Sequence, residues 1–210
     1  MSYAVKEMFL TLQGEGVQAG RRAVFVRFAG CNLWSGREQD RATAVCRFCD
    51  TDFIGTDGAG GGRFADATQL VAAAVDFWGE GLRERFVVLT GGEPMLQIDD
   101  ALVEAFHHAG FTIAMESNGT LAAHPGIDWV CISPKAGSVV VQRQGDELKL
   151  VWPQPGSDVA DLERWDFAHH LIQPLDSVDA VANHAAAIDL VMARPRWRLT
   201  LQAHKTLGLR

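Results

Sequence analysis

The stretch Phe86-Val87-Val88-Leu89-Thr90-Gly91-Gly92-Glu93-Pro94 joins a continuous apolar run to a turn with two glycines. An uninterrupted apolar run is typical of a parallel strand that is covered on both faces. Glycines after such a strand let the backbone approach a ligand closely. The stretch predicts a buried strand, Phe86 to Thr90, followed by a turn suited to binding.

Six further runs rich in Val, Ile and Phe alternate with amphipathic stretches, as βα units around a parallel sheet do. We expect one α/β domain, residues 1–210, built as a partial, open TIM-like barrel of parallel strands, because the chain supplies fewer units than a full barrel needs. The further expected strands are Ala23 to Phe28, Thr112 to Glu116, Trp129 to Ser133, Glu147 to Val151, Leu171 to Gln173 and Arg198 to Leu201. The expected helices are Asp66 to Trp78, Ile98 to Ala109, Asp158 to Trp165 and Ser177 to Ala193.

Composition excludes several classes of protein. Of the 210 residues, 48% are hydrophobic and 21% are charged, as in ordinary globular domains. The net charge is −7, and no stretch concentrates Lys and Arg, so we expect no nucleic-acid partner. No window approaches the ~18 uninterrupted apolar residues of a membrane-spanning helix. Lys6, Glu7 and Glu15 interrupt what would be the apolar part of a secretory signal, so we expect a cytoplasmic protein.

Polar groups directly follow four of the expected strands. In parallel α/β folds, binding sites form at the carboxyl ends of the strands, so these groups are expected to share one mouth. They are Gly91-Gly92-Glu93-Pro94, Glu116-Ser117-Asn118-Gly119, Ser133-Pro134-Lys135 and Gln173-Pro174.

Three of the four cysteines, Cys31, Cys46 and Cys49, have the spacing C-x14-C-x2-C. A C-x2-C pair places two thiolates on one short turn, which suits zinc or an iron–sulfur cluster. A structural zinc ion needs a fourth ligand, and none follows nearby; three thiolates would leave one iron of a cluster open. The spacing alone leaves a cluster, zinc and unligated thiols as alternatives. Cys131 lies in an apolar run and is expected to be a small buried hydrophobe.

Several motifs in one order resemble the radical S-adenosylmethionine (SAM) superfamily and, more narrowly, the 7-carboxy-7-deazaguanine synthase family. They are Cys31-Asn32-Leu33-Trp34, Cys46-Arg47-Phe48-Cys49-Asp50-Thr51, Gly91-Gly92-Glu93-Pro94, Phe9 to Gly16, Glu116 to Thr120, Ser133-Pro134-Lys135 and Leu201 to Lys205. The resemblance runs from Phe9 to the C-terminus. The superfamily's usual spacing is C-x3-C-x2-C, and Leu33 to Val45 enlarges the first gap, as in some members of the synthase family.

The resemblance implies a 4Fe-4S cluster on Cys31, Cys46 and Cys49, with SAM on its open iron. Reductive cleavage of SAM would then yield a 5′-deoxyadenosyl radical, while the protein binds and orients the reactants. No catalytic side chain is implied beyond the cluster and this radical. The SAM-binding positions that it implies are Phe48, Asp50, Gly92, Glu93, Ser133, Lys135 and Gln173.

The family's substrate is 6-carboxy-5,6,7,8-tetrahydropterin, whose ring contracts with loss of ammonia in queuosine and deazapurine biosynthesis. Arg27 is the candidate partner of the substrate carboxylate, and Gln13, Glu15 and Glu116 are candidate acceptors for its N–H groups. The substrate-binding positions that the resemblance implies are Leu12, Gln13, Gly14, Glu15, Arg27, Thr90, Glu116, His204 and the terminal carboxylate of Arg210. Many family members end in Ile-Pro, where this chain has Leu209-Arg210.

The resemblance also implies Mg²⁺ at Thr51, a one-electron reductant such as flavodoxin or ferredoxin, and a homodimer. Magnesium prefers hard oxygen ligands and completes its octahedron with water or substrate oxygens. Two other functions remain open from the sequence: a radical SAM activase of a glycyl-radical enzyme, and a zinc-stabilised binding module without catalysis.

Overall fold

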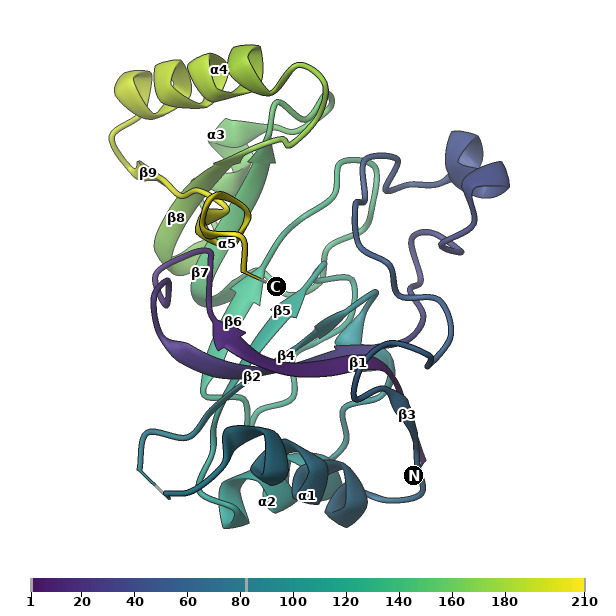
Figure 1. The fold of residues 1–210 in the computed structure, drawn as a ribbon. Coiled ribbons are helices and arrows are strands. Elements are labelled where there is room, and N and C mark those ends of the chain that lie inside the picture. The colour runs from purple at the N-terminus through teal and green to yellow at the C-terminus, as the bar shows by residue number, and fades with distance from the viewer. Residues whose placement is uncertain (1, 82, 210) are drawn as a thin grey trace.

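A single nine-stranded sheet forms the centre of the computed structural model, which describes residues 2–81 and 83–209 (Figure 1). The strand order is β3-β1-β2-β4-β5-β6-β7-β8-β9. Neighbours from β2 to β9 are parallel, whereas β1 is antiparallel to β2 and β3. The strands are β1 (Tyr3–Leu12), β2 (Arg22–Phe28), β3 (Gly62–Phe64), β4 (Phe86–Gly91), β5 (Thr112–Ser117), β6 (Trp129–Ile132), β7 (Gln144–Trp152), β8 (Asp166–Pro174) and β9 (Trp197–Leu199).

This sheet confirms the expected α/β class and the open barrel. Within the described residues, the end strands β3 and β9 each pair with one neighbour, so the sheet does not close on itself. Each of the seven expected strands is present, and Phe86, Val87, Val88 and Leu89 of β4 are fully buried, as the apolar run predicts.

The apolar pattern does not predict β1. Lys6 and Glu7 interrupt it, and the register against β2 shifts between Val5 and Glu7, so the alternation of buried and exposed residues is broken there. Val5 and Met8 are nevertheless fully buried. The strand is recognisable only once its partner β2 is in place.

The helices cover the sheet in two groups (Figure 1). α1 (Ala67–Trp78) packs against α2 (Asp100–His108) and the strands β1, β2 and β3, and α2 packs on β5, while α4 (Ala180–Ala193) packs on β7, β8 and β9. The shorter elements are α3 (Val159–Leu162), α5 (Ala203–Leu207) and the 3₁₀ helices η1 (Glu38–Thr43) and η2 (Pro94–Leu96). The four expected helices are confirmed, although α3 is shorter than predicted. Among the described residues, no helix has the length and apolar character needed to cross a membrane.

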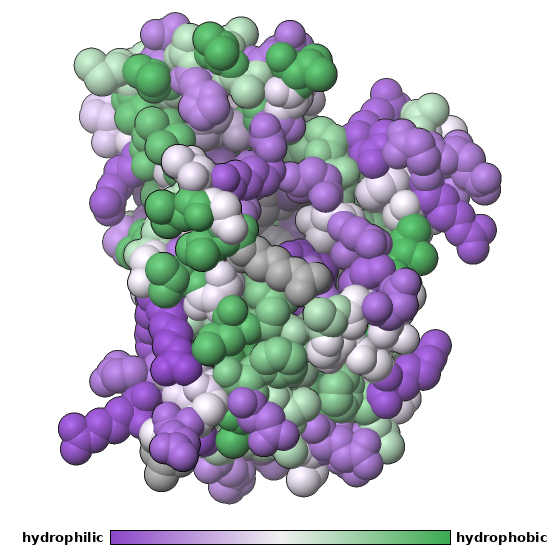
Figure 2. Space-filling model, viewed as in Figure 1, coloured by the Kyte–Doolittle hydropathy of each residue, from purple (hydrophilic) through white to green (hydrophobic). Residues whose placement is uncertain are grey.

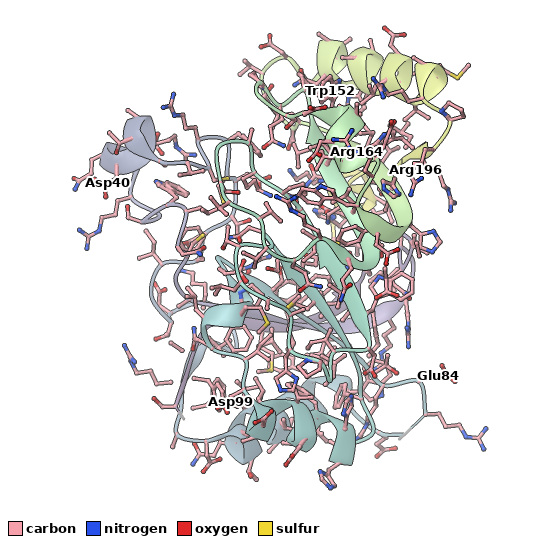
Figure 3. The ribbon with its side chains drawn as sticks, turned by 180° about the vertical axis from the view of Figure 1, so that it is seen from behind. Asp40, Glu84, Asp99, Trp152, Arg164 and Arg196 are labelled. Carbon is pink, nitrogen blue, oxygen red and sulfur yellow. The ribbon has the colours of Figure 1, made fainter. Side chains whose placement is uncertain are left out.

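Aspartate side chains accept hydrogen bonds from backbone N–H groups at the N-terminal ends of α1 and α2. Asp66 accepts a hydrogen bond from the Gln69 amide at 2.9 Å, and Asp99, labelled in Figure 3, accepts one from the Leu102 amide at 3.0 Å. Asp99 also accepts a hydrogen bond from the Tyr3 hydroxyl at 2.6 Å. The cap of α2 therefore also anchors the start of β1.

The connection between β1 and β2, residues 13–21, reaches the other end of the sheet. Its Gly16 amide donates to the Thr200 hydroxyl at 2.8 Å, and its Val17 amide donates to Glu147 on β7 at 3.1 Å. The Gly14 carbonyl accepts from the Ala203 amide at 2.9 Å. This connection lies beside β7 and α5 in Figure 1 and joins the two ends of the open sheet.

The buried face of α2 supplies a test of the packing. Phe106 is fully buried and meets Phe111 edge-on, with ring centroids 5.5 Å apart. We expect Phe106→Ala to lower the free energy of unfolding by about 3–5 kcal/mol, because the cavity that it leaves cannot collapse fully. Urea unfolding followed by circular dichroism measures the change.

Met192→Ala on α4 is the matched control, since 80% of the Met192 surface is exposed. Its effect should stay within about 0.5 kcal/mol. Equal losses for the two variants would contradict the packing described for α2.

Candidate active site

One large cavity of about 470 Å³ opens at the carboxyl ends of the parallel strands. It brings together nearly all of the side chains that the motifs single out, as expected for a parallel α/β fold. Of the expected site residues, those that line it are Leu12, Gln13, Gly14, Glu15, Arg27, Cys31, Cys46, Phe48, Cys49, Asp50, Thr51, Thr90, Gly92, Glu116, Ser133, Lys135, Gln173 and His204. Glu93 does not line it, and Arg210 lies outside the described residues.

The three cysteines of the C-x14-C-x2-C motif line this cavity with free thiols. A hydrogen bond from Cys46 and one from the Thr51 amide lower the pKa of Cys49 to about 6, although burial acts to raise it. Burial raises the pKa of Cys31. Across the described residues, no three His, Cys, Asp or Glu side chains are grouped closely enough to hold a single metal ion. The described side chains therefore supply no ready site for a single structural zinc ion, which needs four converging ligands.

The two glycines of the turn after β4 are required by close backbone contacts. A Cβ atom on Gly92 would lie 2.1 Å from the Gly30 carbonyl oxygen, and Gly91 has a φ of 137°. Only glycine fits these two constraints without displacement. The two glycines let the turn pass directly beside Cys31. A Cβ atom added at Gly92 would lie 2.8 Å from the Cβ atom of Cys31.

Glu93 ties that turn to the end of β5. Its carboxylate accepts hydrogen bonds from the Ser117 hydroxyl at 2.8 and 3.0 Å, the Asn118 amide at 2.9 Å and the Met95 amide at 3.0 Å. The residue is fully buried, and burial raises its pKa. These contacts make Glu93 a residue that positions the turn, and its role toward SAM stays a prediction.

Ser133 and Lys135 follow β6 and lie at the cysteine side of the cavity. Lys135 donates to the Ser133 carbonyl at 2.6 Å and to the Ser133 hydroxyl at 2.7 Å. Burial lowers the pKa of Lys135, while Cys46 and Cys49 act in the opposite direction. Lys135 thus lies close enough to Cys46 and Cys49 to interact electrostatically with both.

A network of carboxylates and donors occupies the strand side of the cavity. Glu116 accepts hydrogen bonds from Gln13 at 3.1 Å and from the Thr90 hydroxyl at 3.1 Å. Lys149 on β7 pairs with Glu15 and lies 3.6 Å from Glu116. The motifs do not single out Lys149. Its signal in the sequence is a charged residue between two leucines of a buried strand, Leu148 and Leu150.

Arg27 lines the cavity from β2, and its Nε atom donates to Glu7 at 2.9 Å. Glu7 also lines the cavity and is a second residue that the motifs do not indicate. The pair is about one-fifth exposed, with side-chain values of 21% and 16%. Arg27 has five N–H donors, so this contact leaves it the capacity to meet an anionic ligand as well.

The C-terminal helix α5 lies over the cavity. A Cβ atom on Gly14 would be 2.3 Å from His204 Nδ1, so only glycine lets the two segments meet. Lys205 pairs with Asp50 at 3.0 Å and with Asp176 at 2.5 Å. These contacts join α5 to the cysteine loop and to the segment after β8.

The enlarged cysteine loop projects away from the barrel. Asp40 in η1, labelled in Figure 3, lies at the outer end of this projection. Arg41 donates to the Cys49 carbonyl at 3.1 Å and stacks 4.1 Å from the centre of the Trp34 ring. The insertion therefore braces the loop that carries the second and third cysteines.

Known proteins include relatives that match this chain over its full length. The chain matches no protein-family model. It is 57% identical over 209 residues to the 7-carboxy-7-deazaguanine synthase of Burkholderia multivorans and 56% identical over 210 residues to that of Bradyrhizobium diazoefficiens, with 100% of each chain covered. The crystal structure of QueE from Escherichia coli superimposes with a TM-score of 0.70 at 27% identity, covering 97% of this chain and 95% of that chain.

An open barrel of parallel strands with three free thiols at its mouth, together with this structural likeness, defines the radical SAM class. Within that class, the chain belongs to the 7-carboxy-7-deazaguanine synthase family.

Glu93 offers a test of how the site is positioned. We expect Glu93→Ala to lower the free energy of unfolding by about 3 kcal/mol, because it leaves buried donors on Met95, Ser117 and Asn118 without their acceptor. Urea unfolding of iron-free protein measures this. Glu104→Ala on the exposed face of α2 is the control and should have almost no effect. A Glu93→Ala protein as stable as the control would show that these contacts do not hold the turn.

Proposed function

We propose that this chain is a carbon–nitrogen lyase that contracts the ring of 6-carboxy-5,6,7,8-tetrahydropterin to 7-carboxy-7-deazaguanine with loss of ammonia. The observation that carries the proposal is the cavity, which unites three free thiols with a set of carboxylate and amide acceptors in a chain 53–57% identical to synthases of this name. The reaction belongs to queuosine and deazapurine biosynthesis.

Cys31, Cys46 and Cys49 would hold the 4Fe-4S cluster, and the fit is supported by their free thiols around one open cavity. When bound, the cluster and SAM supply the radical that abstracts hydrogen from the substrate. A second observation supports the SAM site: Gln173 lines the cavity, and its Oε1 atom is buried without a hydrogen-bond partner among the described residues. The residues assigned to SAM are Phe48, Asp50, Gly92, Ser133, Lys135 and Gln173, with Glu93 acting beneath the turn.

The remaining lining residues orient the pterin. Arg27 binds the substrate carboxylate as a charge-assisted partner. Gln13, Glu15 and Glu116 accept hydrogen bonds from the ring N–H groups, because an ionised carboxylate has only acceptor sites. Leu12, Gly14, Thr90 and His204 complete the substrate contacts, with the terminal carboxylate of Arg210. Holding the ring in one orientation is the protein's main contribution to the reaction.

Mg²⁺ binds at Thr51, which lines the cavity next to Cys49 and Asp50. A hydroxyl is a hard oxygen ligand, and the substrate carboxylate and water supply the others. The ion screens the carboxylate charge and restricts the pose of the pterin. The working enzyme is a single domain of residues 1–210, a cytoplasmic homodimer, and takes its electron from a flavodoxin or ferredoxin.

The proposal is tested by incubating reconstituted, reduced enzyme with SAM, Mg²⁺ and the carboxypterin and looking for 7-carboxy-7-deazaguanine by mass spectrometry. Replacing any one of Cys31, Cys46 or Cys49 by Ala should abolish both product formation and SAM cleavage, since a three-thiolate site has no spare ligand. Cys131→Ala is the control and should keep both, because Cys131 is buried within β6. Loss of iron from Cys131→Ala but not from Cys31→Ala would show the ligand assignment to be wrong.

The magnesium site has its own prediction. Thr51→Ala should lower turnover by about 10-fold or more and blunt the response to added Mg²⁺, while the brown colour of the cluster and SAM binding stay unchanged. Thr43→Ala, which removes a hydroxyl from η1 outside the cavity, is the matched control. Turnover of wild-type enzyme that a Mg²⁺ chelator leaves unchanged would argue decisively against the ion.

A further inference from the structure

Lys149 is a buried cation between two carboxylates that face the large cavity. Its side chain is 7% exposed and reaches inward from β7. It pairs with Glu15 from the β1–β2 connection and lies 3.6 Å from Glu116 at the carboxyl end of β5. Three segments far apart in the chain therefore meet at one ammonium group.

Each of the two carboxylates is also held from its other side. Gln202 donates to Glu15 Oε1 at 2.9 Å, and Gln13 donates to Glu116 Oε1 at 3.1 Å. The Thr90 hydroxyl donates to Glu116 Oε2 at 3.1 Å. These donors fix the orientation of the carboxylates, but they are neutral and do not offset charge. Lys149 supplies the largest favourable charge interaction of Glu15, and His204 adds a smaller one.

One side of this group of charges has little room for solvent. A small second cavity of about 10 Å³ lies against Glu15, Glu116 and Lys149, with Glu147 on its wall. That volume has room for about one water molecule and no hydrated cation. Burial acts to raise the pKa of Glu15, but Lys149, with smaller contributions from Gln202 and His204, outweighs it, so the net effect is a lowered pKa.

Two carboxylates that share a buried site without a cation do not both stay ionised, because like charges at short range favour protonation of one of them. A protonated carboxyl group becomes a hydrogen-bond donor. Its O–H group would then face an N–H group of the ligand, donor against donor, instead of accepting a hydrogen bond from it. The charge of Lys149 therefore decides whether the pair presents acceptors to the cavity.

We propose that Lys149 is a positioning residue for the substrate: it keeps Glu15 and Glu116 ionised together, so that the pair recognises the N–H edge of the pterin, including its exocyclic amine. The inference rests on the function proposed above and adds to it a residue that selects an aminopyrimidine edge. Lys149 acts through the two glutamates and does not itself touch the ring.

The test compares two ligands by calorimetry: the carboxypterin, and its analogue with hydrogen in place of the exocyclic amine. SAM-loaded, cluster-containing enzyme is used without reductant, so that no turnover occurs. Wild-type enzyme should bind the carboxypterin roughly 10- to 100-fold more tightly than the analogue, as expected for a hydrogen bond to a charged group. In Lys149→Met, the ratio of the affinity for the carboxypterin to that for the analogue should fall below about 3-fold, because one hydrogen-bond acceptor is lost.

Two variants separate this role from a purely structural one. Lys149→Arg keeps the cation and should recover most of the ratio. Arg85→Met removes another buried cation, one that donates to the Ala109 carbonyl at 2.7 Å and does not line the large cavity, and should keep the full ratio. If Lys149→Met does not fold, Lys149→Gln takes its place with the same expected loss.

A ratio in Lys149→Met or Lys149→Gln that equals the wild-type ratio would overturn the inference, even where both ligands bind more weakly. Wild-type enzyme that binds the carboxypterin but does not distinguish it from the analogue would overturn it as well. Wild-type enzyme that neither binds nor converts the carboxypterin would instead overturn the proposed function, and the inference with it.

Discussion

Charged side chains on the inner face of the sheet are stable only because each is paired with a charge of the opposite sign from another segment. Lys149 pairs with Glu15, and Arg27 pairs with Glu7. An unpaired charge in such a position costs several kcal/mol, whereas a pair that is well hydrogen-bonded costs little. The connection between β1 and β2 must therefore reach across to β7, and this reach is what spans the open side of the barrel.

This constraint divides the cavity into two chemically different sides. The loop after β2 carries the three cysteines, with Lys135 nearby, whereas β1, β2, β5 and the β1–β2 connection carry Arg27 and the glutamates. The cysteine loop is anchored separately, since Lys6 binds Asp52 and the Ile54 carbonyl just after it. An iron–sulfur cluster and the pterin ring of a substrate can thus be held by separate sets of residues that line the same cavity. Figure 2 shows polar and apolar residues interspersed on the face where these segments meet.

The sequence by itself determined the class of fold and the composition of the cavity mouth. Continuous apolar runs such as that of β4 can be buried on both faces only in a sheet covered by helices, so local pattern was sufficient for them. The groups that directly follow strands share one edge for the same reason, and this brought Ser133 and Gln173 to the cavity with the cysteines. The motif around Cys31, Cys46 and Cys49 then indicated the family.

The tertiary structure alone decided the pairing and direction of the charged groups. The bulge in β1 breaks the alternation that would have predicted the strand, and Lys149 is a lone lysine until β5 and the β1–β2 connection bring Glu116 and Glu15 to it. Glu93 turns beneath its loop because three donors from β5 and η2 meet it there. Partners so distant along the chain leave no local pattern, because their contact depends on how strands are ordered in the sheet.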